Sequence, residues 1–148
     1  LSGGVAYTDA QIERFRAADG TLSGARQGER LALAPELKYS LAANYRIEPG
    51  PLPFGVRLNA QYAYTDEQFS DLGANPLFRL DSYGALDAEI TLFDRDERFS
   101  VSLIGRNLTD ESFASLITPG GPGNALRYQI PREADRYFGV AIRSKFGG

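Results

Sequence analysis

Apolar and polar residues alternate with a period of two along much of the chain, which is the pattern of β-strands that have one apolar and one polar face. The clearest stretch is ELKYSLAANYRI, residues 36–47, in which every second residue from Leu37 to Ile47 is aliphatic or aromatic. The alternation recurs in residues 54–65, 82–93, 99–106 and 137–146, and in a shorter stretch around Val5 and Tyr7. The pattern predicts an all-β chain of about six strands.

The two faces of the five longer segments differ in charge. The apolar register carries no charged residue, whereas the opposite register carries nine. Strands with such faces lie between an apolar phase and water. The alternation alone does not decide whether the apolar phase is a protein core or lipid, because a soluble antiparallel sheet alternates in the same way.

Aromatic residues and connection lengths favour lipid as the apolar phase. Aromatic side chains of the apolar register gather toward the strand ends, as they do in the girdles of membrane barrels; they are Tyr39, Tyr45, Phe54, Tyr62, Tyr64, Phe99, Phe138 and Phe146. The connections 48–53 and 94–98 are short, whereas 9–35, 66–81 and 108–136 are long and rich in Gly, Pro and charged residues. Short turns on one side and long loops on the other are typical of outer-membrane barrels.

Composition narrows the chemistry that the chain can perform. Its 148 residues have the length of one ordinary domain and include no Cys, His, Met or Trp. Disulfide frameworks, Cys/His metal sites and nucleophile–histidine pairs are therefore excluded. The net charge of −3 comes with scattered Lys and Arg, which is not the basic stripe of a nucleic-acid-binding protein. We accordingly predict no enzymatic activity, no metal site, no cofactor and no nucleic-acid partner.

The start of the chain does not read as a natural amino terminus. It begins with Leu1, and the opening LSGGVAYT has neither the basic nor the apolar region of a signal peptide. No apolar run is long enough for a transmembrane helix. We therefore expect Leu1 to lie inside a longer protein.

The segment VSLIGRNLTDESF, residues 101–113, runs from a strand into a polar loop with no turn-forming Gly or Pro at the junction. SLIGRNLTDESF resembles the strand-to-loop junction near the carboxyl end of TonB-dependent outer-membrane receptors, where an Asn-Leu-Thr-Asp-Glu run is followed by an aromatic residue. The stretches GERLALAPELKYSLAANYR, LNAQYAYTDEQFSD, DSYGALDAEITL and RYFGVAIRSKF are similar to other strands of that barrel, in the same order. The resemblance covers nearly the whole chain.

The resemblance implies a fold, a location and partners. Residues 1–148 would be the carboxyl-terminal barrel segment: an antiparallel up-and-down meander of about six strands, a fragment of a transmembrane β-barrel of about 22 strands. The plug domain and the TonB-coupling segment would be absent. The parent protein would lie in the bacterial outer membrane and import a scarce solute such as a ferric siderophore. Its partners would be outer-membrane lipid, the remaining barrel strands and plug, the TonB complex through the missing amino-terminal segment, and a small-molecule ligand.

The resemblance also gives the junction a role. Strands of such barrels continue past the membrane, so residues 107–111 need not turn the chain and would carry the strand into an extracellular loop. In the first long connection, AQIERFRAADG is compatible with a short helix at the loop tip.

Two groups of residues are candidates for sites inside the barrel or at its mouth. Arginines and aromatic residues of the long loops suit an anionic or aromatic chelate, and the ligand-binding candidates are Arg14, Phe15, Arg30, Phe69, Phe78, Arg127, Tyr128 and Arg132. On the polar face, Asp87 and Glu89 lie on a strand whose neighbours carry Arg57 and Arg106, which predicts a charge ladder that faces the lumen. An acid–base pair of Asp87 and Glu89 is the less favoured alternative, because no partner group for catalysis accompanies them.

The last strand carries a candidate assembly signal. Its apolar residues Phe138, Val140 and Ile142 lead to Phe146, which would be the terminal aromatic residue of the family. This chain continues with Gly147 and Gly148, where family members usually end on the aromatic residue. A different class of protein remains open beside the receptor, namely a structural or soluble lipid-binding β-barrel domain.

Overall fold

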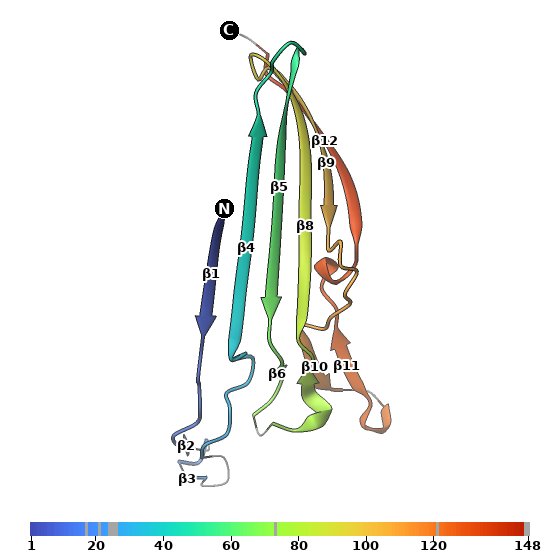
Figure 1. The fold of residues 1–148 in the computed structure, drawn as a ribbon. Helices are drawn as coiled ribbons and strands as arrows, with labels where there is room; N and C mark the ends of the chain where they lie inside the picture. The colour runs from blue at the N-terminus through green and yellow to red at the C-terminus, as the bar shows by residue number, and fades with distance from the viewer. Residues whose placement is uncertain (17, 21, 24–26, 73, 121, 147–148) are drawn as a thin grey trace.

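The computed structural model describes residues 1–16, 18–20, 22–23, 27–72, 74–120 and 122–146. Its main feature is one antiparallel sheet with the strand order β1-β4-β5-β8-β9-β12 (Figure 1). These strands are β1 (Ser2–Tyr7), β4 (Leu37–Ile47), β5 (Phe54–Thr65), β8 (Tyr83–Asp94), β9 (Phe99–Arg106) and β12 (Tyr137–Ser144). Each pairs with the next one in the chain, so the predicted all-β, six-strand up-and-down meander is confirmed.

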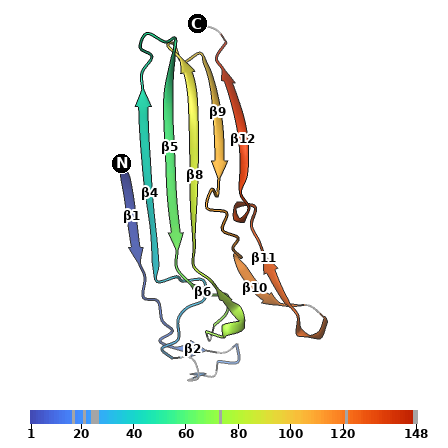
Figure 2. The ribbon, with the colours of Figure 1, turned by 45° about the vertical axis from the view of Figure 1, so that its right-hand side comes forward.

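The connections alternate in length and sort to opposite ends of the sheet (Figures 1 and 2). Two tight turns, 48–53 and 95–98, lie at one end, which we call the turn end. Three long connections lie at the other, the loop end: loop A (residues 8–36), loop B (66–82) and loop C (107–136). The loop asymmetry predicted from the sequence is therefore present.

The long loops contain small elements of their own. Loop A holds β2 (Phe15–Arg16) and β3 (Leu22–Ser23), loop B holds β6 (Gln68–Phe69), η2 (Pro76–Phe78) and β7 (Arg79–Leu80), and loop C holds β10 (Leu116–Pro119), η3 (Pro122–Asn124), β11 (Leu126–Gln129) and η4 (Arg132–Ala134). The short helix with which AQIERFRAADG is compatible does not form in its described residues, because Phe15–Arg16 form a strand and Gln11 makes a β-bridge with Arg30.

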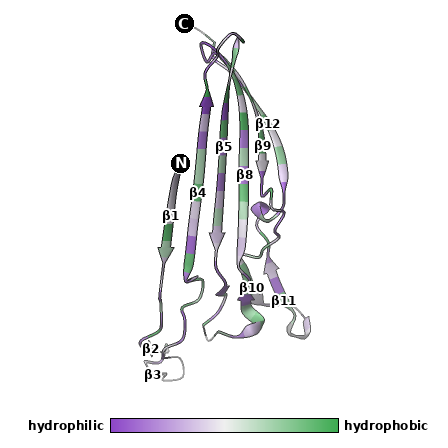
Figure 3. Cartoon of the chain, viewed as in Figure 1, coloured by the Kyte–Doolittle hydropathy of each residue, from purple (hydrophilic) through white to green (hydrophobic). Residues whose placement is uncertain are grey.

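The register aligns the apolar residues of neighbouring strands into one continuous face. Tyr45 lies opposite Leu58, Leu58 opposite Ile90, and Ile90 opposite Leu103. On the edge strand β12, Val140 extends the same row and is 68% exposed. The hydropathy colours alternate in bands along β4, β5 and β8 (Figure 3). One face of the sheet is therefore apolar from β1 to β12, as the sequence pattern predicts.

No second layer of described residues covers this apolar face, and the sheet stands as a single wall (Figures 1 and 2). The buried apolar residues are Ile12, Leu80, Phe93, Ile117 and Ala134, and all lie in the loops or on the polar register. A sheet with an apolar face must bury it against another element or an apolar phase. The described part of this chain does not supply such an element.

The final strand ends two residues before its predicted boundary. β12 stops at Ser144, so Phe146 lies beyond the ladder. The backbone N–H of Lys145 donates to the carbonyl of Arg98 in the adjacent tight turn instead (2.8 Å). Lys145 thus attaches the end of β12 to the turn end of the sheet.

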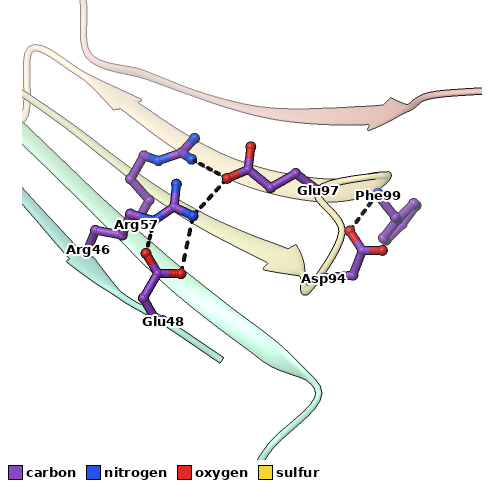
Figure 4. A network of polar contacts seen from close by, with 6 residues as sticks. All are labelled: Arg46, Glu48, Arg57, Asp94, Glu97 and Phe99. Carbon is purple, nitrogen blue, oxygen red and sulfur yellow. Dashed lines mark hydrogen bonds and ion pairs between the residues drawn. The ribbon is translucent and has the colours of Figure 1, made fainter. Parts of the chain in front are cut away.

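A charged cluster on the polar face ties the two tight turns together (Figure 4). This turn cluster consists of Arg46, Glu48, Arg57 and Glu97. The Arg46 guanidinium contacts Glu48 Oε1 at 2.5 Å and Glu97 Oε1 at 2.7 Å, and Arg57 reaches the same Glu97 oxygen at 3.5 Å. Hydrogen bonds from Arg46 hold the pKa of both glutamates below the ordinary carboxyl value.

One aromatic ring is buried on the polar face beside this cluster. Phe93 is 2% exposed although it lies on the polar register. Its partner across the ladder is Gly55, and a Cβ at Gly55 would lie only 2.4 Å from the ring. Arg46 and Arg57 lie over the ring at 4.5 and 5.2 Å from its centroid. The glycine provides the space for the ring, and the two guanidinium groups cover it.

Candidate functional site

The middle of the polar face is a shallow, hydrophilic hollow of about 250 Å³. Its polar lining consists of Asn44, Asn59, Gln61, Asp87, Glu89 and Arg106. Uncharged carboxamides and ionised groups of both signs on one wall suit a water-filled or protein-filled lumen rather than an apolar ligand. The hollow has no bulky apolar lining residue, which distinguishes it from the opposite face of the sheet.

Only half of the predicted charge ladder forms. Arg106 Nη1 contacts Asp87 Oδ2 at 2.8 Å, as predicted for neighbouring strands. Arg57 instead pairs with Glu97, and Glu89 accepts a hydrogen bond from the Thr91 hydroxyl (3.0 Å). The Asp87–Arg106 part of the predicted ladder is therefore present, and the part that would join Arg57 to Glu89 is wrong. The reason is the register, which places Arg57 opposite Thr91 rather than opposite Glu89.

The strand-to-loop junction also differs from the prediction. Asn107 has φ 46° and Asp110 has φ 58°, and the N–H of Asp110 donates to the carbonyl of Asn107 (2.9 Å). The chain therefore turns at residues 107–110 and does not continue as a strand. Glycine is not required at these positions because Asn and Asp adopt the left-handed conformation more readily than other residues with side chains.

Loops B and C pack against each other at the loop end. The N–H of Ile117 donates to the Ser70 hydroxyl (2.9 Å), and Ile117 and Leu80 are both buried. The Phe113 ring of loop C stacks on Tyr83 at the start of β8, with 3.7 Å between centroids and 3° between planes. Loop C therefore packs both on loop B and, through Phe113, on the start of the wall strand β8.

A pocket of about 260 Å³ lies between these two loops. Apolar and aromatic groups form much of its lining, with one guanidinium, one carboxylate and two serine hydroxyls among them; the lining residues are Arg79, Leu80, Asp81, Ser82, Ser112, Phe113, Ala114, Ile117, Tyr128 and Ile130. An apolar pocket with a few polar groups is the usual form of a small-molecule site. Its volume suits one ring or a comparable portion of a solute.

The structure does not bring the predicted ligand-binding residues into one cluster. Tyr128 is the member of that set that lines the pocket between loops B and C. Arg127 precedes it on β11, and Phe69 and Phe78 lie in loop B, in β6 and η2. Arg132 lies over the Tyr137 ring, 5.0 Å from its centroid.

The predicted residues of loop A lie apart from this pocket. Arg14 lines a different cleft of about 670 Å³, to which Leu72 of loop B also contributes. Arg30 forms an ion pair with Glu36. The backbone of Phe15 belongs to β2, whereas its side chain is outside the described part of the structure.

Several pocket residues were not among the candidates from the sequence. Arg79, Asp81 and Ile117 are the clearest cases. Arg79 lies in β7 and Asp81 in the short link to β8, and the two form an ion pair of 3.0 Å. The signal in the sequence was two residues of opposite charge shortly before a predicted strand. Ile117 had no local signal, because its burial depends on contact with loop B.

The candidate assembly residues divide into two groups. Phe138, Val140 and Ile142 lie on the apolar register of the edge strand β12 and are exposed. Phe146 lies beyond the strand and is almost fully exposed. Their role in assembly stays a prediction.

No three His, Cys, Asp or Glu side chains come together as possible metal ligands in the described part of the chain. Among the same residues, no helix is long and apolar enough to cross a membrane.

A family model described as "TonB dependent receptor-like, beta-barrel" matches residues 1–108. The chain belongs to this family. The match runs from β1 through β9 and ends just after Asn107, so it includes five of the six wall strands. No curated protein and no solved structure matches the chain.

Membership of the TonB-dependent receptor barrel family gives the general class of activity. The family consists of receptors and transporters rather than enzymes, and its members are outer-membrane β-barrels that interact with a plug and with TonB. The single-walled, two-faced sheet is the structure that such a barrel wall requires.

Proposed function

We propose that residues 1–148 are the carboxyl-terminal part of the wall of an outer-membrane importer, with the apolar face toward lipid and the polar face toward the lumen. The observation that carries this proposal is the continuous, uncovered apolar face. Large apolar side chains stay exposed along its whole width, from Val5 on β1 to Val140 on β12. An apolar surface this large is not stable in water and is stable in lipid.

The polarity of the two ends supports an orientation. In outer-membrane barrels the short turns face the periplasm and the longer loops face the exterior. The turn end would therefore be periplasmic, and loops A, B and C would be extracellular. The pocket between loops B and C would then face the side from which solute arrives.

The solute that we propose is an anionic or aromatic chelate, such as a ferric siderophore. The support is the chemistry of the loop end, where Phe113, Tyr128 and Arg79 line one pocket. A flat ring packs well against such aromatic walls, and the Arg79 guanidinium, which also pairs with Asp81, has further N–H donors for an anionic group of the chelate. The remaining barrel strands, a plug and the TonB complex are the partners that import would require.

The orientation of the faces can be tested with two adjacent positions on β12. In the full parent receptor in vesicles, Val140→Cys and Ala141→Cys each receive an environment-sensitive fluorophore. Both residues are exposed, but they lie on opposite registers. Lipids with brominated chains should quench the label at 140 and leave the label at 141 unchanged, whereas a water-soluble quencher should show the reverse preference.

The same measurement separates the importer from the alternative of a soluble lipid-binding β-domain. A soluble domain would not insert in vesicles, and brominated lipid chains would then quench neither position. For the solute, uptake of a panel of radioactive iron chelates is compared in the source bacterium with and without the parent gene. Loss of uptake of one chelate supports the proposal, and unchanged uptake of all of them rejects an iron chelate without affecting the assignment of the wall.

A further inference from the structure

The side chain of Asn107 joins the two ends of loop C. It is the most buried polar side chain among the described residues, at 1% exposed. Its Nδ2 donates to the carbonyl oxygen of Glu111, at the start of the loop, and to that of Ala134, close to its end; both distances are 3.0 Å. One carboxamide therefore connects Glu111 and Ala134, which are far apart in the sequence, and so closes loop C at its base.

The oxygen of the same carboxamide is also bonded. Asn107 Oδ1 accepts the N–H of Glu111 (3.3 Å) and lies 2.9 Å from the Thr109 hydroxyl. Both N–H donors and the carbonyl of the amide thus have partners. A buried amide that is fully satisfied is costly to replace, because the groups left behind lose their hydrogen bonds and remain away from water.

The first residues of loop C are in turn attached to the wall strand β8. The N–H of Leu108 donates to the Leu86 carbonyl (2.7 Å), and Glu111 Oε2 accepts the N–H of Gly84 (2.7 Å). The Thr109 hydroxyl lies 2.8 Å from the Gly84 carbonyl. The pairing of β8 with β9 ends at Ala88, so the backbone groups of Gly84 and Leu86 on that side of β8 are paired with loop C instead. Leu108, Thr109 and Glu111, the neighbours of Asn107 in the chain, therefore attach the start of loop C to β8.

We propose that Asn107 is a clamp that fixes loop C on the wall, so that the pocket between loops B and C exists before a solute arrives. Loop C supplies Ser112, Phe113, Ala114, Ile117, Tyr128 and Ile130 to this pocket, and Asn107 itself does not line it. Asn107 is therefore a positioning residue. A pocket whose lining is ordered before the solute arrives lowers the entropic cost of binding. The role of Asn107 in solute capture rests on the proposed function, whereas its role in holding loop C on the wall does not depend on that function.

The test measures access to loop C in the purified parent receptor in detergent. Ala114→Cys is the reporter, because Ala114 is half-buried in the pocket and residues 1–148 contain no cysteine. The rate of its reaction with a maleimide is compared in the native background, in Asn107→Ala and in Asn107→Asp. Aspartate keeps the size and one accepting oxygen but lacks both N–H donors. We expect labelling at least about tenfold faster in both variants, since each loses buried hydrogen bonds.

Two controls separate the clamp from a general loss of stability. Ala34→Cys, a half-buried alanine in loop A, should react at the same rate in every background. Asn75→Ala removes a local hydrogen bond to the N–H of Leu77 in loop B and should leave the reaction at position 114 unchanged. The amount of barrel that resists unfolding in cold SDS is measured in parallel.

Three results would overturn the proposal. Labelling at position 114 that is unchanged in the folded Asn107 variants would show that loop C does not depend on the clamp. Equal acceleration at positions 34 and 114 would show a general destabilisation. If neither variant gives a folded barrel, Asn107 serves the wall rather than the loop. None of these measurements needs lipid orientation or a solute, so their failure is distinct from failure of the proposed function.

Discussion

An arginine at Leu41 should destabilise the parent barrel far more than an arginine at the next residue, Ala42. Leu41 is 59% exposed on the apolar face, whereas Ala42 lines the polar hollow. Leu41 lies about 13 Å along β4 from Leu37, at about 3.3 Å per residue. With a strand tilt of about 40°, this is about 10 Å along the membrane normal. With Leu37 at the edge of an apolar band about 25 Å tall, this depth places Leu41 close to the bilayer midplane.

The expected cost follows from this depth. An arginine on the lipid face at the midplane costs about 2 to 4 kcal/mol. That free energy corresponds to a change of about 30- to 700-fold in the folding equilibrium. At Ala42 the guanidinium would extend into the polar hollow beside Asn44 and Gln61, where water and carboxamides solvate it. We therefore expect a small effect for Ala42→Arg.

The assay is urea unfolding of the full parent receptor in vesicles, followed by the loss of the SDS-resistant form. Leu41→Ala separates the loss of the leucine side chain from the introduction of charge. Thr91 would be a poor lumen-side control, since it is buried and bonded to Ser102 at 2.7 Å. Equal urea midpoints for Leu41→Arg and Ala42→Arg would refute the assignment of the two faces.

Three further outcomes are expected. Because the pKa values of the two glutamates in the turn cluster are lowered, the folded state holds fewer protons than the unfolded state. Their stabilisation is present at neutral pH and is lost as the pH falls below about 4.5. Lower protection factors in the tight turns, meaning amide exchange that is faster relative to an unstructured peptide at the same pH, would reveal this loss. Gly55→Ala should destabilise the folded receptor by about 1 to 3 kcal/mol and so lower its yield, because the new Cβ meets the Phe93 ring and, at 2.8 Å, the carbonyl oxygen of Ile47 in β4. The control Gly50→Ala should have almost no effect, because a Cβ at Gly50 has nothing within 4 Å. Phe146→Ala should reduce the receptor assembled in the outer membrane, measured on heated and unheated gels, more than Phe99→Ala does; similar losses would make Phe146 an ordinary interface residue.

The sequence by itself determined the strands and their faces. The segments 54–65 and 99–106 were predicted with the boundaries that β5 and β9 have, and the predicted bounds of β4, β8 and β12 differ from the observed ones by one or two residues. This is possible because alternation with a period of two is a local property: a residue's neighbours in the chain decide which side of a strand it occupies. The alternation of short and long connections followed directly from the same boundaries.

Only the tertiary structure decided which side chains meet. Whether Arg57 pairs with Glu89 or with Glu97 depends on the register and on the path of a turn, not on the spacing within either strand. Phe93 could be buried on the polar face because the register places Gly55 opposite it. These are properties of pairs of strands, and a single strand does not contain them.

Asn107 shows most clearly what the sequence alone does not predict. Its position after a strand was visible, but its role depends on a carbonyl at Ala134, 27 residues away along the chain, and on β8 as the partner of the turn. A buried amide requires that all of these groups are present at once, since each unpaired group would be costly. Local pattern determines the wall because each strand's alternation is sufficient for it, whereas hydrogen bonds between distant segments determine the loops, and the fold alone brings those segments together.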